Sequence, residues 1–189
     1  MILPVKRIIY VLLLVTLTSA PFAFSNDFFV SVDGGIGGVR LNQKYEVDGL
    51  ADDKIYTSSI SANIGIVFDS SVVLGIGGLG SAGGIFIFVD ETYAVVQEQM
   101  FVGYRFPVGK NLRITPNIGF THWALRTEQD SLSHSDPVTR KFNGNDVFGQ
   151  LNFEFPVSHL VTVFGSYTRT NYDFGNSNSL KAGVMFEFK

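Results

Sequence analysis

The sequence predicts an all-β fold, an eight-stranded antiparallel up-and-down transmembrane β-barrel. Three observations carry this prediction. Apolar and polar residues alternate with period 2 through most of the chain, and the connections between these segments alternate between short and long. After residue 25, no stretch shows a 3.6-residue apolar period with helix caps.

The composition restricts the class of protein before any element is placed. Of the 189 residues, 16% are charged, which is below the ~25% of soluble domains, and 18 Phe and 20 Gly are present. The lack of Cys excludes a disulfide scaffold and a thiolate metal site. The formal net charge of -3 argues against nucleic acid as a partner.

The first 25 residues have the layout of a signal peptide. Lys6 and Arg7 precede an apolar run at residues 8–17, and Ala23 and Ser25 supply the small residues that a signal peptidase reads. An uncleaved anchor is the alternative, but the run is short of the ~20 residues that a spanning helix needs. We expect cleavage after Ser25, a signal peptide at 1–25 and one barrel domain at 26–189.

Eight segments read as strands. In chain order they cover residues 28–39, 59–68, 72–89, 99–106, 112–121, 147–155, 161–172 and 180–188. The third segment is uncharged and long enough for a membrane helix, and Gly80 with Gly84 forms a GxxxG pattern. Its six glycines and β-branched flanks favour a strand, because each Gly costs a helix about 1 kcal/mol relative to Ala.

The connections indicate a barrel with two unlike ends. Tight turns are expected at 69–71, 106–112 and 155–160, and long polar stretches at 42–54 and 128–146, with a shorter one at 171–179 and a tip at 90–92. Outer-membrane barrels have this arrangement, with the short turns in the periplasm. The first strand must pair with the last, because an open sheet edge is too costly in hydrocarbon.

Alternation alone also fits a soluble barrel with the opposite parity, which stays as the alternative. Aromatic residues beside the short turns favour the membrane, since they form an interfacial girdle; they are Phe68, Phe106, Phe155 and Phe188. The polar face carries residues that can pair across a narrow lumen near the same end: Arg105, Arg113, Glu154, Lys181 and Glu187. Asn63, Gln99 and Gln150 join them, so we expect a packed polar plug and not an open channel.

Two positions depart from the simple pattern. Pro116 lies inside a strand, where it cannot donate a ladder hydrogen bond, so we expect a bulge there. Glu98 falls on the lipid face. Either it lies above the membrane or the register slips at that point.

The chain resembles the small outer-membrane barrels of the opacity-type and OmpA-like family. The resemblance rests on the signal peptide, eight strands over the mature chain, the Gly-Tyr-Arg-Phe-Pro turn at 103–107 with 115–120 after it, and the ending at 183–188. It implies an outer-membrane location and insertion by the barrel assembly machinery, which in such proteins reads the last strand, here Val184, Phe186 and Phe188. Lys189 departs from the family's usual aromatic ending.

The candidates for chemistry are few. His122 stands beside Trp123 near the outer interface and is interpreted as an interfacial anchor, with a catalytic base as the alternative. His134 belongs to a solvated loop and His159 is the third histidine. Glu46, Asp48, Asp52 and Asp53 form an acidic loop whose spacing misses the EF-hand pattern. We expect no cofactor, no metal and no enzymatic activity.

Three functions remain open from the sequence. The leading hypothesis is a structural or surface-interaction barrel, of the adhesin or opacity type, which contacts outer-membrane lipid and presents loops 42–54 and 128–146 to an extracellular ligand. The second is a narrow porin or small-solute transport barrel. The third is a lipid-modifying enzyme that uses His122.

Overall fold

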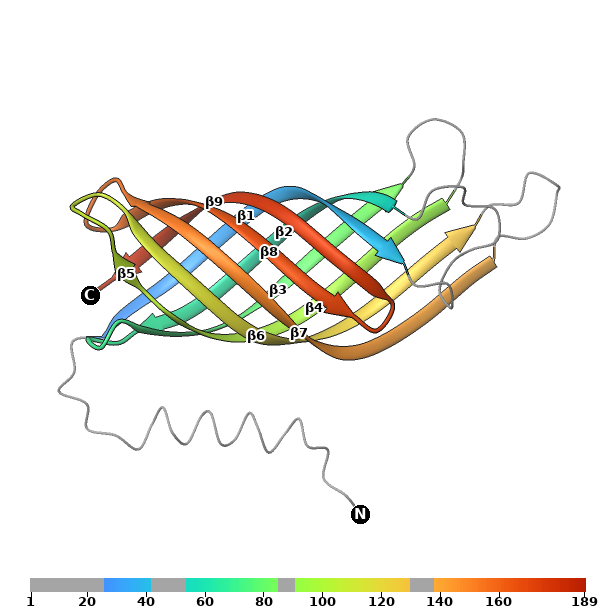
Figure 1. Ribbon diagram of the computed structural model, residues 1–189, viewed down its shortest axis with the longest axis horizontal. Helices are drawn as coiled ribbons and strands as arrows, with labels where there is room; N and C mark the ends of the chain where they lie inside the picture. Colours follow the sequence, from blue (N-terminus) through green and yellow to red (C-terminus); the bar gives the residue numbers. More distant parts are fainter. Residues whose placement is uncertain (1–25, 42–53, 85–90, 130–137) are drawn as a thin grey trace, which may run out of the picture.

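The computed structural model describes residues 26–41, 54–84, 91–129 and 138–189. These residues form nine β elements and no helix (Figure 1). The elements are β1 (Asp27–Leu41), β2 (Lys54–Val67), β3 (Val72–Gly84), β4 (Glu91–Tyr104), β5 (Phe106–Pro107), β6 (Arg113–Gln129), β7 (Val138–Pro156), β8 (Val161–Tyr172) and β9 (Gly175–Phe188). Within the described ranges, no helix has the length and apolarity that crossing a membrane requires. The predicted signal peptide lies outside the described residues.

The strands close into an eight-stranded antiparallel up-and-down barrel, as predicted. Each strand pairs with its neighbour in the chain, and β1 pairs with β9 from Phe28 opposite Phe188 to Leu41 opposite Gly175. β4 pairs with β6, and β5 continues the β4 wall after Arg105 in the same register. The closure leaves no open edge along the stretch that β1 shares with β9, as hydrocarbon demands.

The three tight turns lie at one end of the barrel, which we call the turn end (Figure 1). At the first, Ser71 adopts a positive φ of 66° and its amide donates to the Phe68 carbonyl at 2.7 Å. At the second, Gly109 has a φ of 75°, a left-handed conformation that Gly adopts without a Cβ clash. At the third, the Ser158 hydroxyl accepts hydrogen bonds from the amides of Leu160 and Val161. The opposite end is called the loop end.

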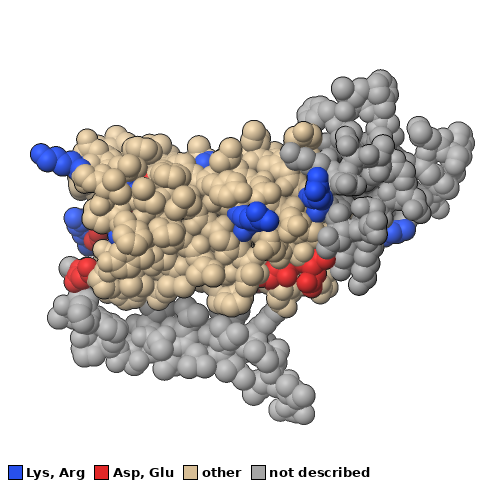
Figure 2. All heavy atoms as spheres, in the orientation of Figure 1, with Lys and Arg blue, Asp and Glu red and all other residues tan. Residues whose placement is uncertain are grey.

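The side chains sort by parity into an apolar outer band and a mostly polar lumen. The band begins with exposed aromatic residues at the turn end; these are Phe28, Tyr104, Phe106, Phe153, Phe155, Phe186 and Phe188. It continues through aliphatic side chains such as Ile64, Ile76, Val102 and Val184. In Figure 2, charged side chains gather toward the two ends of the described surface, and the band between them is mostly uncharged.

A row of polar outward side chains ends the band on seven of the eight walls, and we call this row the polar collar. It consists of Arg40, Ser58, Glu98, His122, Asn145, Arg169 and Asn178. The β3 wall carries Gly78, Gly80 and Ala82 at this level. About ten residues of strand separate the collar from the turn end, which at ~3.3 Å per residue and ~40° tilt spans about 25 Å. This matches the apolar band of outer-membrane barrels.

Beyond the polar collar, the apolar and polar residues exchange faces. Toward the loop end, the inward side chains become apolar, and β6 and β7 carry outward Arg126, Lys141 and Asn143. Val96 is an exception, because it is apolar, outward and 64% exposed. The apolar side chains therefore face outward below the polar collar and inward above it.

Glycines make room for the inward aromatic rings. Four rings lie on a glycine directly opposite on the neighbouring strand: Phe29 on Gly65, Phe101 on Gly75, Phe148 on Gly119 and Trp123 on Gly144. A Cβ at any of these four glycines would overlap the ring. The high glycine content thus fits large rings into a narrow lumen.

The strands are longer than predicted, and two predicted loops are wrong. Within 128–146, only residues 130–137 lie outside the described residues; the rest extends β6 and β7. Within 171–179, β8 reaches Tyr172 and β9 starts at Gly175, so the turn is Asp173–Phe174. The apolar alternation is lost in both stretches: at 139–145 the outward side chains are polar, and at 175–179 the inward Ser177 and Ser179 are polar as well. Residues 42–53 lie outside the described residues.

Three further expectations are settled. Residues 72–84 form strand β3, which excludes the helix there, and 85–89 lie outside the described residues. The bulge at Pro116 is wrong, because the register runs unbroken from Gly103 opposite Asn117 to Phe106 opposite Ile114. Pro116 instead interrupts the ladder between β4 and β5, since it lacks an N–H. The register does not slip at Glu98, which faces outward in the polar collar.

Candidate functional site: the closed lumen

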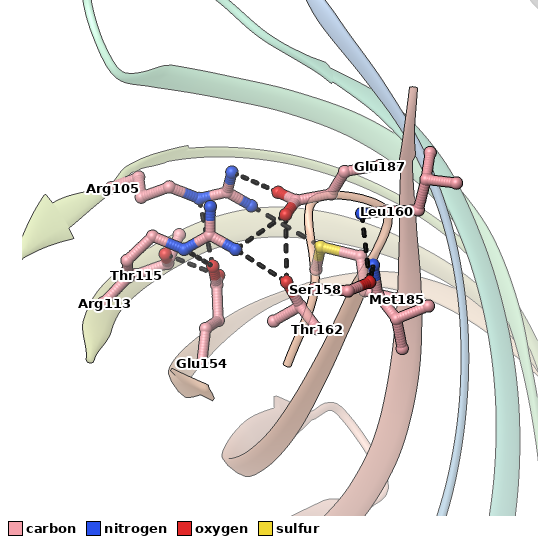
Figure 3. A network of polar contacts seen from close by, with 10 residues as sticks. Arg105, Arg113, Thr115, Glu154, Ser158, Leu160, Thr162, Met185 and Glu187 are labelled. Atoms are coloured by element: carbon pink, nitrogen blue, oxygen red, sulfur yellow. Dashed lines mark hydrogen bonds and ion pairs between the residues drawn. The ribbon is translucent and has the colours of Figure 1, made fainter. Parts of the chain in front are cut away.

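An ionic network closes the lumen at the turn end (Figure 3). Arg105 contacts Glu187 (Nη1 to Oε1, 2.5 Å) and Glu154 (Nε to Oε2, 3.0 Å). Arg113 contacts the same two carboxylates, at 2.7 Å to Glu187 and 3.3 Å to Glu154. Two guanidinium groups and two carboxylates therefore balance in formal charge.

Hydroxyl groups complete the ionic network. The Thr115 hydroxyl donates to Glu154 Oε1 at 2.7 Å, and the Thr162 hydroxyl donates to Glu187 Oε2 at 2.9 Å. Arg113 Nη2 also donates to the Thr162 hydroxyl at 2.8 Å. Glu154 is 1% exposed, so its charge depends on these partners.

Four different walls contribute these side chains. Arg105 follows β4, Arg113 opens β6, and Glu154 and Glu187 stand near the ends of β7 and β9. All four positions have inward parity, and Arg113 lies directly opposite Glu154 in the β6–β7 register. Arg105 Nη2 also lies 3.5 Å from the sulfur of Met185. Met185 belongs to an apolar cluster, which we call the lower apolar cluster, with Phe29, Val67, Val73, Phe101 and Phe164.

Lys181 lies apart from the ionic network. Its Nζ is 3.6 Å from Asp33 Oδ1, and that oxygen also accepts a hydrogen bond from the Ser61 hydroxyl at 2.5 Å. Asp33 and Lys181 are 3% and 6% exposed. Of the five polar residues predicted from the sequence, the structure brings four together and pairs the fifth with Asp33.

The side-chain amides predicted to join the plug, those of Asn63, Gln99 and Gln150, also form hydrogen bonds inside the lumen. Asn63 Nδ2 donates to the Ser31 hydroxyl at 3.4 Å and Asn63 Oδ1 accepts from Gln99 Nε2 at 2.7 Å. Gln150 Oε1 accepts from Asn117 Nδ2 at 3.4 Å. These bonds cross between strands and fill the lumen with polar side chains.

An aromatic layer closes the lumen at the loop end. It comprises Val39, Ile55, Tyr93, Val95, Trp123, Leu125, Tyr172 and Phe174, with Phe142 packed against it. Phe174 stacks on Tyr172, with ring centroids 4.3 Å apart and planes 10° apart, and meets Trp123 edge to face at 4.5 Å. Phe174 is 0% exposed although it belongs to the β8–β9 turn, so this turn points its ring into the lumen.

Asp146 fastens the β8–β9 turn to the barrel wall. Its Oδ2 accepts a hydrogen bond from the Trp123 indole at 2.6 Å and one from the Asp173 amide at 3.0 Å. Below the layer, the Tyr172 hydroxyl accepts a hydrogen bond from Gln97 Nε2, and Gln97 Oε1 accepts one from Thr121. The aromatic layer is thus joined to the polar lumen beneath it.

The aromatic layer was not predicted from the sequence. Trp123 was expected beside His122 at the interface, but it points inward and is 1% exposed. A signal was present on β6, where the apolar positions change from even (Ile118, Phe120) to odd (Trp123, Leu125). Between Phe120 and Trp123, the apolar side chains of β6 therefore change from the outer face of the barrel to the lumen.

The remaining predicted residues lie outside the lumen. His122 faces outward in the polar collar with its Nδ1 2.8 Å from Asn145 Oδ1, and His159 is exposed in the β7–β8 turn. His134 and the acidic residues at 46–53 lie outside the described residues. Val184, Phe186 and Phe188 are exposed on the outer face of β9. The described residues contain no group of three His, Cys, Asp or Glu side chains that can hold a metal ion.

Comparison with known proteins identifies the architecture. A family model described as outer membrane protein beta-barrel domain matches residues 10–188. No curated protein matches the chain in sequence.

Solved outer-membrane barrels share the fold. Neisserial surface protein A (NspA) is 12% identical with a TM-score of 0.61, covering 85% of this chain and 97% of its own. Ail, the attachment invasion locus protein of Yersinia pestis, solved with the heparin analogue sucrose octasulfate, is 12% identical with a TM-score of 0.58, covering 86% and 99%. OprG of Pseudomonas aeruginosa is 9% identical with a TM-score of 0.54, covering 87% and 97%. At these identities the likeness concerns the fold.

Proposed function

Since this chain belongs to the outer membrane protein β-barrel family and is a protein of the bacterial outer membrane, we propose that it is a non-conducting, non-enzymatic barrel that presents its loop end to partners outside the cell. The observation that carries the proposal is the double closure of the lumen, by the ionic network and by the aromatic layer. We further propose that residues 1–25 are a cleaved signal peptide.

The double closure supports a role without transport. A solute that crossed the lumen would have to separate the Arg105 and Arg113 contacts to both carboxylates and displace Phe174 from its stacked position. An eight-stranded ring leaves an interior that side chains just fill. The lumen therefore acts as a packed core.

The loop end supports a role in surface contact. The β6–β7 hairpin reaches Gln129 and Val138, well beyond the polar collar at His122 and Asn145. It presents exposed polar side chains to water, including Arg140 and Lys141. We propose an extracellular ligand at this hairpin and at loop 42–54, as an adhesin or opacity-like protein would have. Ail is named for attachment and invasion, a precedent for such a role on this fold.

Two further partners follow from the outer surface. We propose that the polar collar contacts the headgroups of outer-membrane lipid, because it borders the apolar band. We also propose that the assembly machinery reads Val184, Phe186 and Phe188, which stand exposed on the strand that closes the barrel.

Bilayer recordings test the closed lumen. The barrel refolded in a planar bilayer should give no stepwise current, and its circular dichroism should show β structure in lipid vesicles but not in water without detergent. Discrete current steps would favour the porin alternative, and a folded protein in water would contradict the membrane barrel.

A binding assay tests the surface role. Replacing residues 126–141 by a short turn should reduce cell adhesion or ligand capture while leaving the β spectrum in lipid intact, because the described part of this stretch, 126–129 and 138–141, lies above the polar collar. Unchanged binding by a variant that also lacks loop 42–54 would contradict the proposal. Turnover of an outer-leaflet lipid that is lost in His122→Ala would favour the enzyme alternative.

A further inference from the structure

A carboxylate and an imidazole are neighbours in the polar collar, on the outside of the barrel. Glu98 on β4 lies directly opposite His122 on β6 in the antiparallel register, and both side chains face outward. Residues that are directly opposite on one face of an antiparallel pair have Cβ atoms about 4.5–5.5 Å apart. The Glu98 carboxylate and the His122 ring can therefore reach a common atom placed between them.

Asn145 on β7 orients the His122 ring. Its side-chain Oδ1 lies 2.8 Å from His122 Nδ1. An amide oxygen only accepts hydrogen bonds, so Nδ1 carries the proton and Nε2 of the neutral ring keeps a free lone pair. Histidines that bind metal ions have this arrangement, in which the other ring nitrogen donates to an oxygen and thereby sets the tautomer. Asn145 thus prepares Nε2 to act as a ligand.

Glu98 has no partner for its charge within the part of the chain that the structure describes, since it makes no hydrogen bond or ion pair there. Its outward neighbours on β4, Val96 and Met100, are apolar, and Gly78 opposite it on β3 has no side chain. A Cβ at Gly78 would meet only the Gln97 carbonyl oxygen within 4 Å, so the space beside Glu98 is open. A bound cation would compensate this charge at the edge of the apolar band, where an unpaired charge is costly.

We propose that Glu98 and His122 bind one Zn²⁺ ion on the outer face of the barrel. Imidazole nitrogen and carboxylate oxygen are ligands that Zn²⁺ takes in proteins, at about 2.0–2.2 Å. Ca²⁺ and Mg²⁺ prefer oxygen ligands alone, so the imidazole selects against them. The described residues contain no group of three His, Cys, Asp or Glu side chains, so water molecules complete the coordination.

The position of the site makes it accessible from outside. It lies between β4 and β6 in the polar collar, and an ion reaches it without crossing either closure of the lumen. The sequence did not predict this site, because Glu98 and His122 belong to different strands and only the β4–β6 register brings them together. The inference goes beyond the proposed surface role, and it depends neither on an extracellular ligand nor on a closed lumen.

Zinc titration of the refolded barrel tests the site. The chain has three histidines, so His134→Gln with His159→Gln gives a parent variant in which His122 is the single imidazole. In dodecyl maltoside micelles, which carry no phosphate, this variant should bind one Zn²⁺ ion per barrel in a calorimetric titration. Adding Glu98→Gln or His122→Gln should weaken the binding at least tenfold.

Two asparagines of the polar collar provide a matched comparison. Asn145→Leu should weaken Zn²⁺ binding by about 10–100-fold, because it removes the oxygen that orients the ring. Asn178→Leu is the control and should leave the affinity unchanged, because Asn178 Oδ1 accepts a hydrogen bond from the Tyr167 hydroxyl at 2.8 Å and not from a histidine. Equal effects of the two changes would contradict the orienting role of Asn145.

Nuclear magnetic resonance identifies the ligand atom. On addition of Zn²⁺, the nitrogen-15 resonance of His122 Nε2 should shift, and Nδ1 should stay protonated. A shift at Nδ1 alone, or affinity that survives both Glu98→Gln and His122→Gln, would overturn the proposal. So would displacement of Zn²⁺ by an equal concentration of Ca²⁺, or one ion per two barrels, which marks a site between two copies.

Circular dichroism separates failure of the metal site from failure of the barrel. Each variant should give the β spectrum of the unaltered barrel, because the substituted side chains face outward. A barrel that shows β structure in lipid vesicles but binds no Zn²⁺ would overturn the metal site and leave the proposed surface function standing.

Discussion

Arg105 contacts both carboxylates of the ionic network, and each carboxylate contacts both guanidinium groups. Such a set is neutral only while it is complete, since a lost partner leaves a charge in a buried site. Breaking a buried pair costs about 3–5 kcal/mol, whereas replacing both members by apolar residues is often close to neutral. The effect of a substitution in the ionic network on stability therefore depends on whether its partner is replaced as well.

A double-mutant cycle tests this coupling. Glu154→Leu should lower the free energy of unfolding by about 3–5 kcal/mol, because Arg105 and Arg113 then share one carboxylate. Adding Arg105→Met should restore part of the loss, since Arg113 keeps its 2.7 Å contact with Glu187. Urea unfolding in lipid vesicles measures both steps. Additive losses would contradict a coupled network.

Trp123 is the single tryptophan, so its fluorescence reports on the aromatic layer. Brominated lipids should quench it weakly at every bromine depth, because the ring lies inside the barrel. A Trp123→Phe, Phe120→Trp variant moves the fluorophore to the outer band, where Phe120 is 65% exposed, and should be quenched strongly. Strong quenching of the natural Trp123 would mean that it anchors the barrel at the interface.

Strands β6 and β7 carry two sequence patterns in succession. Their outward residues are mostly apolar below the polar collar and mostly polar above it. The inward residues change in the opposite sense, from polar to apolar, as Trp123 and Leu125 do on β6. Glycine opposite four of the large inward rings is what lets an eight-stranded wall hold these side chains.

Two glycines of β3 allow a matched test. Gly75→Val should destabilise the barrel by about 1–3 kcal/mol, because the new side chain overlaps the Phe101 ring. Gly80→Val should change stability by less than about 0.5 kcal/mol, because a Cβ there meets no atom within 4 Å. Urea midpoints of both variants in the same vesicles decide. Equal losses would show that glycine matters through backbone freedom and not through space.

Strands could be predicted where apolar outward residues alternate with polar inward residues. The outward parity of Phe186 and Val184 was predictable, because lipid imposes one strict pattern on the band. The strand at 138–146 was not, because its outward side chains are polar and resemble those of a loop. The sequence predicted that Arg105, Arg113, Glu154, Lys181 and Glu187 face the lumen. It did not predict which of them contact one another. Lys181 pairs with Asp33 through a register that only the closed ring fixes.

At the scale of the whole molecule, closure of β1 on β9 joins the two ends of the described chain. Phe28 and Phe188 lie opposite each other, with ring centroids 6.2 Å apart. Every wall therefore supports its neighbours around the ring, and loss of one strand would open two edges in hydrocarbon.

Engineered disulfides test the closure, since the chain has no Cys. Val30→Cys with Phe186→Cys places two thiols at partner positions, and the bond should stabilise the barrel by on the order of 4 kcal/mol through loop entropy. Val30→Cys with Leu180→Cys is the control, because six residues of offset separate the thiols by about 20 Å. Efficient oxidation of the control pair, measured by mass spectrometry, would contradict the register.

The proposed contact of the polar collar with lipid headgroups would also fix how the barrel sits in the membrane. The wall cannot slide inward without bringing Glu98, Arg169 and Asn145 into hydrocarbon, and it cannot slide outward without exposing the aromatic residues at the turn end. In a thicker bilayer the lipids must thin around the protein, at a fraction of a kcal/mol per Å of mismatch. The barrel thereby imposes its own thickness on the surrounding lipid and should partition into the thinner regions of a heterogeneous membrane.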